Sequence, residues 1–231
     1  MNQNKEKYQI AIIWVTIFLD LMGVTLIIPF INEFVEQLGG DERHAGFLLA
    51  SYALMQFIFA PVLGKISDKY GRRPILLFGM IGAFFAFLIF GLATQLWLLF
   101  ASRMLAGISN ANISVAQAYI ADITTRKERA SKMGIIQAAF SLGFIVGFPI
   151  GGILAEQFSV ATPSLLAAGL SITNGFFAYF FLPESLSKEN RITEKLSFNP
   201  ISISKHSLKN IITYFKIPKF KPLLIIFLLY S

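Results

Sequence analysis

Long runs of apolar residues are the feature that most constrains what this chain can fold into. A typical one is ILLFGMIGAFFAFLIFGLA, residues 75–93. At the helical rise of about 1.5 Å per residue, about 20 apolar residues cross the hydrocarbon core of a bilayer. Charged residues make up only 14% of the chain and its mean hydropathy is +0.64, whereas soluble domains contain about 25% charged residues. We therefore predict a membrane protein rather than an unusually apolar soluble core.

The apolar runs predict an all-α, polytopic membrane protein with a bundle of six spans. The first run follows two lysines and resembles a signal peptide. It is too long for one, however, and Asp20 interrupts it, so we expect it to be retained as a span. The predicted spans are residues 8–32, 45–64, 74–93, 96–120, 133–155 and 163–182.

The rest of the chain predicts two further parts beyond the six-span bundle of residues 1–182. Residues 183–221 are polar and rich in Ser and Lys, which is typical of a cytoplasmic central loop. Residues 222–231, PLLIIFLLYS, look like the start of a seventh span, but ten residues are too few to cross a membrane as a helix. We therefore expect a truncated half, and we expect this chain alone not to transport.

Lysine and arginine alternate between the two sides of the predicted bundle. The N-terminus, residues 65–73, residues 126–132 and the central loop are basic, whereas Arg43 is the one basic residue in the intervening connections. Basic connections stay in the cytoplasm. We expect a multi-pass protein of the plasma (bacterial inner) membrane with a cytoplasmic N-terminus. The net charge of +7 then reflects membrane topology rather than a nucleic-acid partner.

The composition argues against several classes of chemistry. The chain has no cysteine, and its two histidines, His44 and His206, are far apart in sequence near predicted loops. No metal site, cofactor site or nucleophile–base pair can be identified from the pattern, so we expect the protein not to be an enzyme.

Two ionised residues, Asp20 and Arg103, lie deep within predicted spans. Asp20 is about 18 Å from the cytoplasmic end of the first span and Arg103 about 10 Å from the outer end of the fourth. In a core of about 30 Å these depths nearly coincide, so the two side chains could face each other. Charges inside a membrane mark proton or substrate paths by default. The sequence leaves open either proton coupling or a static ion pair that fixes helix packing.

The second and fifth spans match at an offset of 88 residues, although the predicted topology sends them across the membrane in opposite directions. Such an inverted repeat, here two three-helix units, is typical of transporters. The matched pairs are Gly46 and Gly134, Ala50 and Ala138, Leu54 and Leu142, Pro61 and Pro149, Gly64 and Gly152, and Asp68 and Glu156.

Four short motifs carry a family resemblance. GKISDKYGRRP, residues 64–74, resembles the loop between spans two and three of the major facilitator superfamily, and it supplies Gly64, Asp68, Gly71, Arg72 and Arg73 to that pattern. FLDLMGVTLIIPF in span one, RMLAGISNA in span four and GFIVGFPIGG in span five resemble its drug/proton antiporter branch, which includes tetracycline exporters. The resemblance covers residues 8–182, the N-terminal half of such a transporter.

The resemblance implies roles for two groups of residues. The loop at residues 64–73 is expected to act as a gate, and Arg72 can grip a carboxylate such as Asp122; Lys65 and Lys69 fit simple anchoring at the membrane face. The span-five motif implies close helix packing, with a hinge or leak seal as the alternative. It consists of Gly143, Gly147, Pro149, Gly151 and Gly152, and here Phe148 stands where the family usually has proline.

By resemblance, the expected function is proton-coupled export of a small, partly apolar compound such as a drug. The alternatives are a fragment that does not transport, or a half-transporter that needs a second polypeptide or a homodimer; the expected partners are the lipid bilayer, the substrate and protons. Polar residues within spans four to six either line a substrate cavity or bond between helices. They are Asn110, Asn112, Gln117, Gln137 and Asn174.

Overall fold

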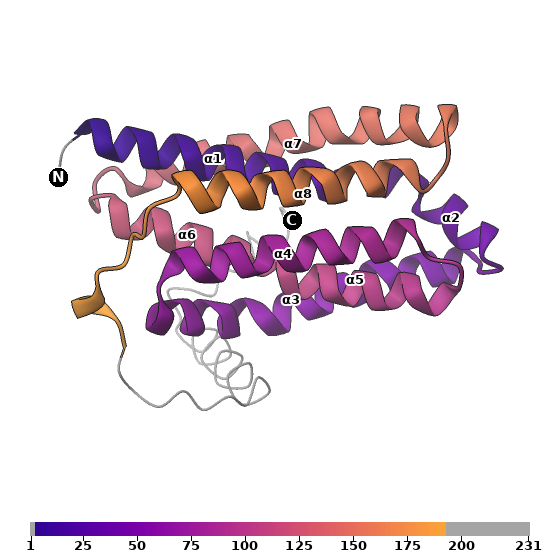
Figure 1. Ribbon diagram of the computed structural model, residues 1–231, viewed down its shortest axis with the longest axis horizontal. Helices are drawn as coiled ribbons and strands as arrows, with labels where there is room; N and C mark the ends of the chain where they lie inside the picture. The colour runs from indigo at the N-terminus through magenta and orange to yellow at the C-terminus, as the bar shows by residue number, and fades with distance from the viewer. Residues whose placement is uncertain (1–2, 193–231) are drawn as a thin grey trace, which may run out of the picture. The chain divides into compact units, whose positions relative to one another are not determined.

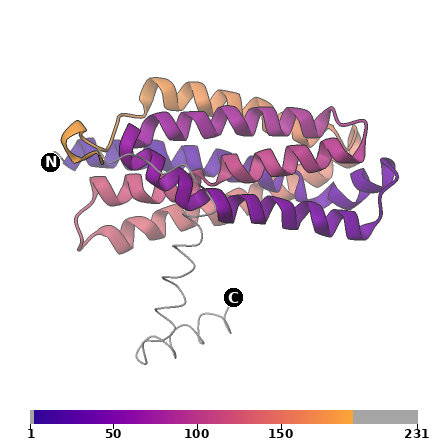
Figure 2. The same ribbon diagram turned by 90° about the horizontal axis from the view of Figure 1, so that it is seen from below.

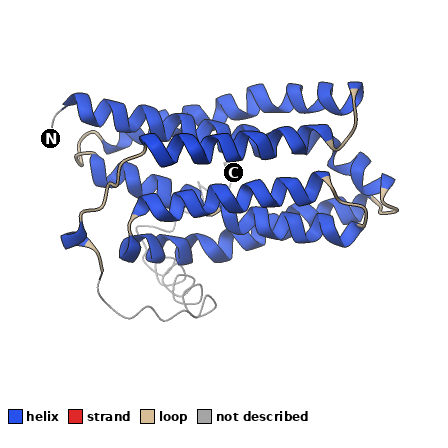
Figure 3. Cartoon of the chain, in the orientation of Figure 1, coloured by secondary structure: helices blue, strands red, loops and turns tan. Residues whose placement is uncertain are grey.

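The computed structural model describes residues 3–192, with side chains from residue 6 onward. These residues form helices and connecting loops without any strand (Figure 3). The predicted central loop beyond residue 192 and the predicted seventh span, residues 222–231, lie outside the described residues. The helices are α1 (Gln3–Thr25), η1 (Ile28–Phe30), α2 (Ile31–Gln37), α3 (Glu42–Tyr70), α4 (Arg72–Gly91), α5 (Leu96–Asn110), α6 (Asn112–Ile123), α7 (Arg129–Gln157), α8 (Thr162–Phe181) and η2 (Lys188–Asn190).

The long helices run back and forth along one bundle axis. Figure 1 places the start of α1, the α3–α4 turn, the α6–α7 connection and the end of α8 together at one end of the bundle. The connections that the sequence predicts to be cytoplasmic therefore lie together in the described part of the chain. We call this end the basic end.

Five segments of the described chain are long and apolar enough to cross a membrane. They are Glu6–Gln37, Glu42–Tyr70, Arg72–Gly91, Arg129–Gln157 and Thr162–Phe181. The predicted fourth span, residues 96–120, is instead divided at Ala111 into α5 and α6, of 15 and 12 residues. Each is shorter than the 17 or more residues that one helix needs to span a bilayer. Both pack along α3 and α4, so together they follow the path of one span.

Hydrogen bonds around Ala111 account for this division. The carbonyl oxygen of Ala111 accepts a bond from the N–H of Ser114 at 3.2 Å, a tighter turn than the α-helical pattern. The hydroxyl of Ser114 also donates to Ala111 at 2.8 Å and to the carbonyl of Ala60 on α3 at 3.0 Å. Serine hydroxyls compete in this way with the backbone ladder and often bend helices. The fourth span is thus built from two consecutive helices, a detail that the predicted span of residues 96–120 did not include.

The neighbours of each helix follow the symmetry that an inverted repeat would produce. The first span, α1, packs against α7 and α8, and its counterpart α5–α6 packs against α3 and α4. In a repeat that pairs the first three spans with the last three, the third span corresponds to the sixth. These two spans, α4 and α8, pack against each other. This arrangement supports the predicted repeat.

Glycines bring α1 and α7 into close contact. Gly143, Gly147 and Gly151, four residues apart, face α1, and a Cβ atom on Gly151 would collide with the carbonyl oxygen of Leu26. The hydroxyl of Thr25 donates to the carbonyl of Gly143 at 2.9 Å. Small residues allow this close approach, which drives helix association inside lipid.

Gly152 does not share this face. Nothing lies within 4 Å of a Cβ built there. The glycines of span five therefore lie on two different faces of α7, because each step of one residue along a helix rotates the side-chain direction by about 100°. Three lie against α1 and one points away from it.

Adjacent glycines provide a matched test of this packing. Gly151→Ala should lower the free energy of unfolding by about 1–3 kcal/mol, because the added methyl group has no room against Leu26. Gly152→Ala should be neutral or slightly stabilising, because alanine favours helix. Thermal unfolding in detergent would measure both, and equal effects would contradict the packing described.

Candidate functional site

Asp20 of α1 lies in a narrow cleft inside the bundle. Its carboxylate accepts a hydrogen bond from the Nδ2 atom of Asn174 on α8 at 2.8 Å. The same Nδ2 donates to the backbone carbonyl of Thr16 at 3.0 Å, so a fully buried asparagine holds α8 against α1 and fixes the carboxylate. The cleft is lined by Thr16, Ile17, Asp20, Leu21, Leu76, Asn110, Asn112, Ile113 and Ala116.

The cleft is small and mixes apolar and polar walls. It offers about 10 Å³ to the centre of a water molecule, close to the least space that holds one water. Asn112 donates to the carbonyl of Leu76 at 2.9 Å, and its Oδ1 is buried without a partner among the described residues. Three of the five polar residues expected to form a cavity therefore lie at Asp20: Asn110, Asn112 and Asn174.

The other two polar candidates lie elsewhere. Gln117 of α6 and Gln137 of α7 are exposed on the surface of the described bundle and do not line the cleft. The sequence showed that both are polar residues within predicted spans, but not the direction in which each side chain points.

Arg103 of α5 is buried, but it does not pair with Asp20. Its guanidinium lies 4.5 Å from the centre of the Phe90 ring on α4. Within the described residues no ion pair joins Arg103 to an acid, and its Nε and Nη2 atoms are buried without a hydrogen-bond partner. The described residues therefore contain no direct ion pair between Asp20 and Arg103, which was one of the two alternatives left open by the sequence. Residue counts give the depth of each charge in the membrane but not its direction around the helix, and α1 packs mainly on α7 and α8 whereas α5 packs on α3 and α4.

The α3–α4 turn forms a second, charged cluster at the basic end. The buried side chain of Arg72 reaches Asp68 at 2.5 Å through Nη1 and Asp122 of α6 at 3.0 Å through Nε. Its Nη1 also donates to the hydroxyl of Ser67 at 2.6 Å. The structure thus places Asp122 beside Arg72, where the sequence suggested a partner. Gly71 joins the two helices with φ of 106°, which few residues other than glycine adopt.

Comparisons with known proteins place these features in a family. The model of the Major Facilitator Superfamily matches residues 13–231. The chain belongs to the major facilitator superfamily. It is 39% identical to the tetracycline resistance protein, class C, of Escherichia coli over 201 residues, which are 86% of this chain and 50% of the relative. It is 37% identical to multidrug resistance protein 2 of Bacillus subtilis (strain 168), over 81% of this chain and 47% of the relative.

A solved structure agrees with this assignment. The crystal structure of the human organic anion transporter MFSD10 (TETRAN) matches with a TM-score of 0.76 and 26% identity, over 86% of this chain and 53% of that protein. The chain spans about half the length of the relatives it matches. The all-helical fold and the multi-pass membrane assignment therefore agree with an N-terminal half of a major facilitator transporter.

Glu184, which follows α8, is a key residue of the charged cluster that the sequence analysis missed. Its carboxylate accepts bonds from the backbone N–H groups of Arg72 at 2.8 Å and Arg73 at 3.3 Å. It also accepts from the N–H groups of Ser185 and Leu186, and Arg191 lies 3.7 Å away. Glu184 thus caps the N-terminus of α4, where the helix dipole favours a negative charge.

The sequence did contain a signal for this cap. The residue before α4 is Gly71, which has no side-chain oxygen to accept the free N–H groups of the first turn. An acid from elsewhere in the chain can accept these N–H groups, and Glu184 is the first acid after the sixth span, near the predicted basic end. A Cβ on Gly71 would collide with its carboxylate, so glycine is also needed for this approach.

Glu184→Ala should lower the free energy of unfolding by about 1–3 kcal/mol, because it leaves several partly buried N–H groups without an acceptor. Glu189→Ala is the matched control, since Glu189 is exposed. Thermal unfolding of both variants in the same detergent would test this. Equal stability of the two variants would show that the cap contributes nothing.

Proposed function

We propose that the chain is the N-terminal half of a proton-coupled exporter of a small, partly apolar compound such as a drug. The observation that carries this proposal is the Asp20 carboxylate in a cleft between α1, α4 and the α5–α6 path. The relatives are named for resistance to tetracycline and to multiple drugs, which supports this substrate class. In this proposal the chain has no enzymatic role.

Asn174 gives Asp20 a partner in either protonation state. Its amide N–H donates to the charged carboxylate, while its Oδ1 is buried without a partner in the described residues. If the amide turned over, that oxygen would accept the O–H of a protonated carboxyl, because an amide offers a donor and an acceptor. A charged carboxylate is costly inside a membrane, so proton uptake from the cavity relieves that cost and can be coupled to a change of helix packing.

We further propose that a second six-helix bundle completes the cavity. In the 18-residue apolar stretch of α3 only 17% is buried, and in that of α7 only 22% is buried. The corresponding value for the first span is 56%. Four glycines on these two helices have open space where a Cβ would stand, and they are two of the pairs in the predicted repeat: Gly46 with Gly134, and Gly64 with Gly152.

Open small-residue faces allow another helix to pack closely. The bundle that packs there comes from the remainder of the protein, a second polypeptide or a second copy of this chain. Transporters of this kind rock one bundle against another around a site at the interface, so α3 and α7 would form the moving contact.

The charged cluster at the basic end is proposed to act as the gate. Arg72 links the end of α3 to the end of α6 through Asp68 and Asp122, and Asp122 also accepts from the hydroxyl of Ser185 beyond α8 at 3.1 Å. Arg72 and its partner Asp122 therefore join three segments: the end of α3, the end of α6 and the residues after α8. Breaking one tie would free the turn to move when the two bundles rock.

Asp20→Asn should abolish proton-driven transport in the transporter that carries both halves, because the amide cannot exchange a proton. We expect at least a tenfold loss of substrate flux driven by a pH gradient in proteoliposomes, a loss typical of a proton-transfer group. Substrate binding without a gradient should remain. Glu33→Gln, an exposed acid of α2, is the control. Full gradient-driven flux in the Asp20 variant would remove Asp20 from the mechanism.

The orientation can be tested with single cysteines, since the natural sequence has none. We expect Arg43→Cys, at the start of α3, to react with a membrane-impermeant maleimide added outside intact cells. Lys127→Cys, in the α6–α7 connection, should react only after the cells are opened. The reverse pattern would place the N-terminus outside.

A further inference from the structure

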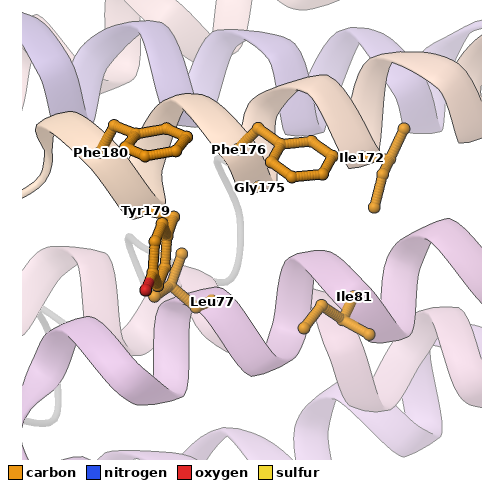
Figure 4. A pocket seen from close by; sticks show the side chains of 7 residues that line it. All are labelled: Leu77, Ile81, Ile172, Gly175, Phe176, Tyr179 and Phe180. Atoms are coloured by element: carbon orange, nitrogen blue, oxygen red, sulfur yellow. The ribbon is translucent and has the colours of Figure 1, made fainter.

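A groove of about 450 Å³ runs between α4 and α8 on the surface of the bundle. Leu77 and Ile81 of α4 form one wall. The other wall belongs to α8, and Figure 4 shows Tyr179 reaching from it toward Leu77 at one end of the groove. The lining is apolar apart from the Tyr179 hydroxyl. The residues of α8 that line it are Ile172, Gly175, Phe176, Tyr179 and Phe180.

The groove lies away from the faces proposed to meet a second bundle. In Figure 2, α8 and α4 follow one side of the bundle, with α3 and α7 toward the opposite side. Packing of α3 and α7 against a partner would therefore leave the groove open to the membrane. Because it lies near the start of α4 and the end of α8, it faces the leaflet at the basic end.

Arg73 stands at the mouth of the groove. Its guanidinium lies 5.6 Å from the centre of the Tyr179 ring, and its Nη2 donates to the backbone carbonyl of Tyr179. That is the one hydrogen bond of the Arg73 side chain among the described residues, and no acid there forms an ion pair with it. The nearby carboxylate of Glu184 is already occupied by backbone N–H groups and Arg191.

We propose that this groove binds one acyl chain of an anionic phospholipid, with the phosphate of its headgroup at Arg73. The apolar lining suits hydrocarbon and excludes a polar ligand. Arginine binds phosphate with short, charge-assisted hydrogen bonds, and basic pockets between membrane helices on the cytoplasmic side hold anionic headgroups. Tyr179 lies at the headgroup level, where tyrosine is enriched in membrane proteins.

The charge and the apolar groove lie in the right order for a lipid. Arg73 is in the first turn of α4, and Leu77 and Ile81 follow at intervals of four residues, so they continue along one helix face toward the membrane interior. On α8 the same order runs backward from Tyr179 through Phe176 to Ile172. A headgroup at the membrane surface and a chain below it would contact these residues in sequence.

The test is quenching of a single tryptophan by brominated phospholipid. The full chain would carry Trp14→Phe and Trp97→Phe, with Phe176→Trp as the groove reporter. Phe78→Trp is the control reporter, because Phe78 lies beside Leu77 on α4, is 67% exposed and does not line the groove. Nanodiscs would contain unbrominated phosphatidylcholine with a fixed fraction of brominated phosphatidylglycerol or brominated phosphatidylcholine.

At the groove reporter we expect phosphatidylglycerol to associate about fivefold more strongly than phosphatidylcholine, a preference that one arginine near the surface supplies. The control reporter should show no such preference. Arg73→Gln should remove the preference at Phe176→Trp, and Lys127→Gln, which changes a charge in the α6–α7 connection, should leave it intact.

Three results would overturn the proposal: equal quenching by the two lipids at the groove reporter, the same preference at both reporters, or a preference that survives Arg73→Gln. The comparison of the two reporters needs no change at Arg73. It therefore decides the question even if the glutamine variant fails to fold. A protein segment seated in the groove would appear as weak quenching by both lipids.

Discussion

Hydrocarbon offers no hydrogen-bond partner, so a polar group inside the membrane must find one within the protein or remain costly. Side chains of the described bundle meet this demand by donating to backbone carbonyls of neighbouring helices. The bonds between spans include Thr25 to Gly143, Asn112 to Leu76, Ser114 to Ala60, and Asn174 to Thr16. They join α1 to α7, α6 to α4, α6 to α3, and α8 to α1. Two of these bonds, Asn112 to Leu76 and Asn174 to Thr16, also end on residues that line the cleft at Asp20.

Conditions at the basic end differ from those in the hydrocarbon core, because water and lipid headgroups lie close to this end. Arg72 is nonetheless buried, and a buried charge needs several partners to offset its loss of hydration. Two carboxylates and a hydroxyl supply them. Glu184 meanwhile satisfies the first turn of α4. The end of α3, the start of α4, the end of α6 and the residues after α8 therefore meet in one cluster of ion pairs and hydrogen bonds.

Much of the architecture follows from the sequence, since hydropathy sets the spans and the motifs set the family. The sequence did not reveal the break at Ala111, which depends on a serine that reaches another helix. The separation of Gly152 from Gly151 was predictable, because helical geometry alone turns adjacent residues to different faces. The missing Asp20–Arg103 contact was not, since rotation of a helix about its axis depends on packing across the whole bundle.

Asp20 and Arg103 are predicted at similar depths in the membrane, but their surroundings in the structure differ. Asp20 has an amide donor and lies in a cleft whose size is close to the least that holds one water. Arg103 lies against the Phe90 ring, and two of its guanidinium nitrogens, Nε and Nη2, are buried without partners in the described chain. A ring under a desolvated cation recovers about 2 kcal/mol, while each unmet donor costs about 1–3 kcal/mol. The arrangement at Arg103 is therefore close to break-even at best in the described bundle. Equal depth in the membrane therefore does not give two charges the same environment. Asp20 has an amide donor from α8, whereas Arg103 in the described chain lies against the Phe90 ring of α4.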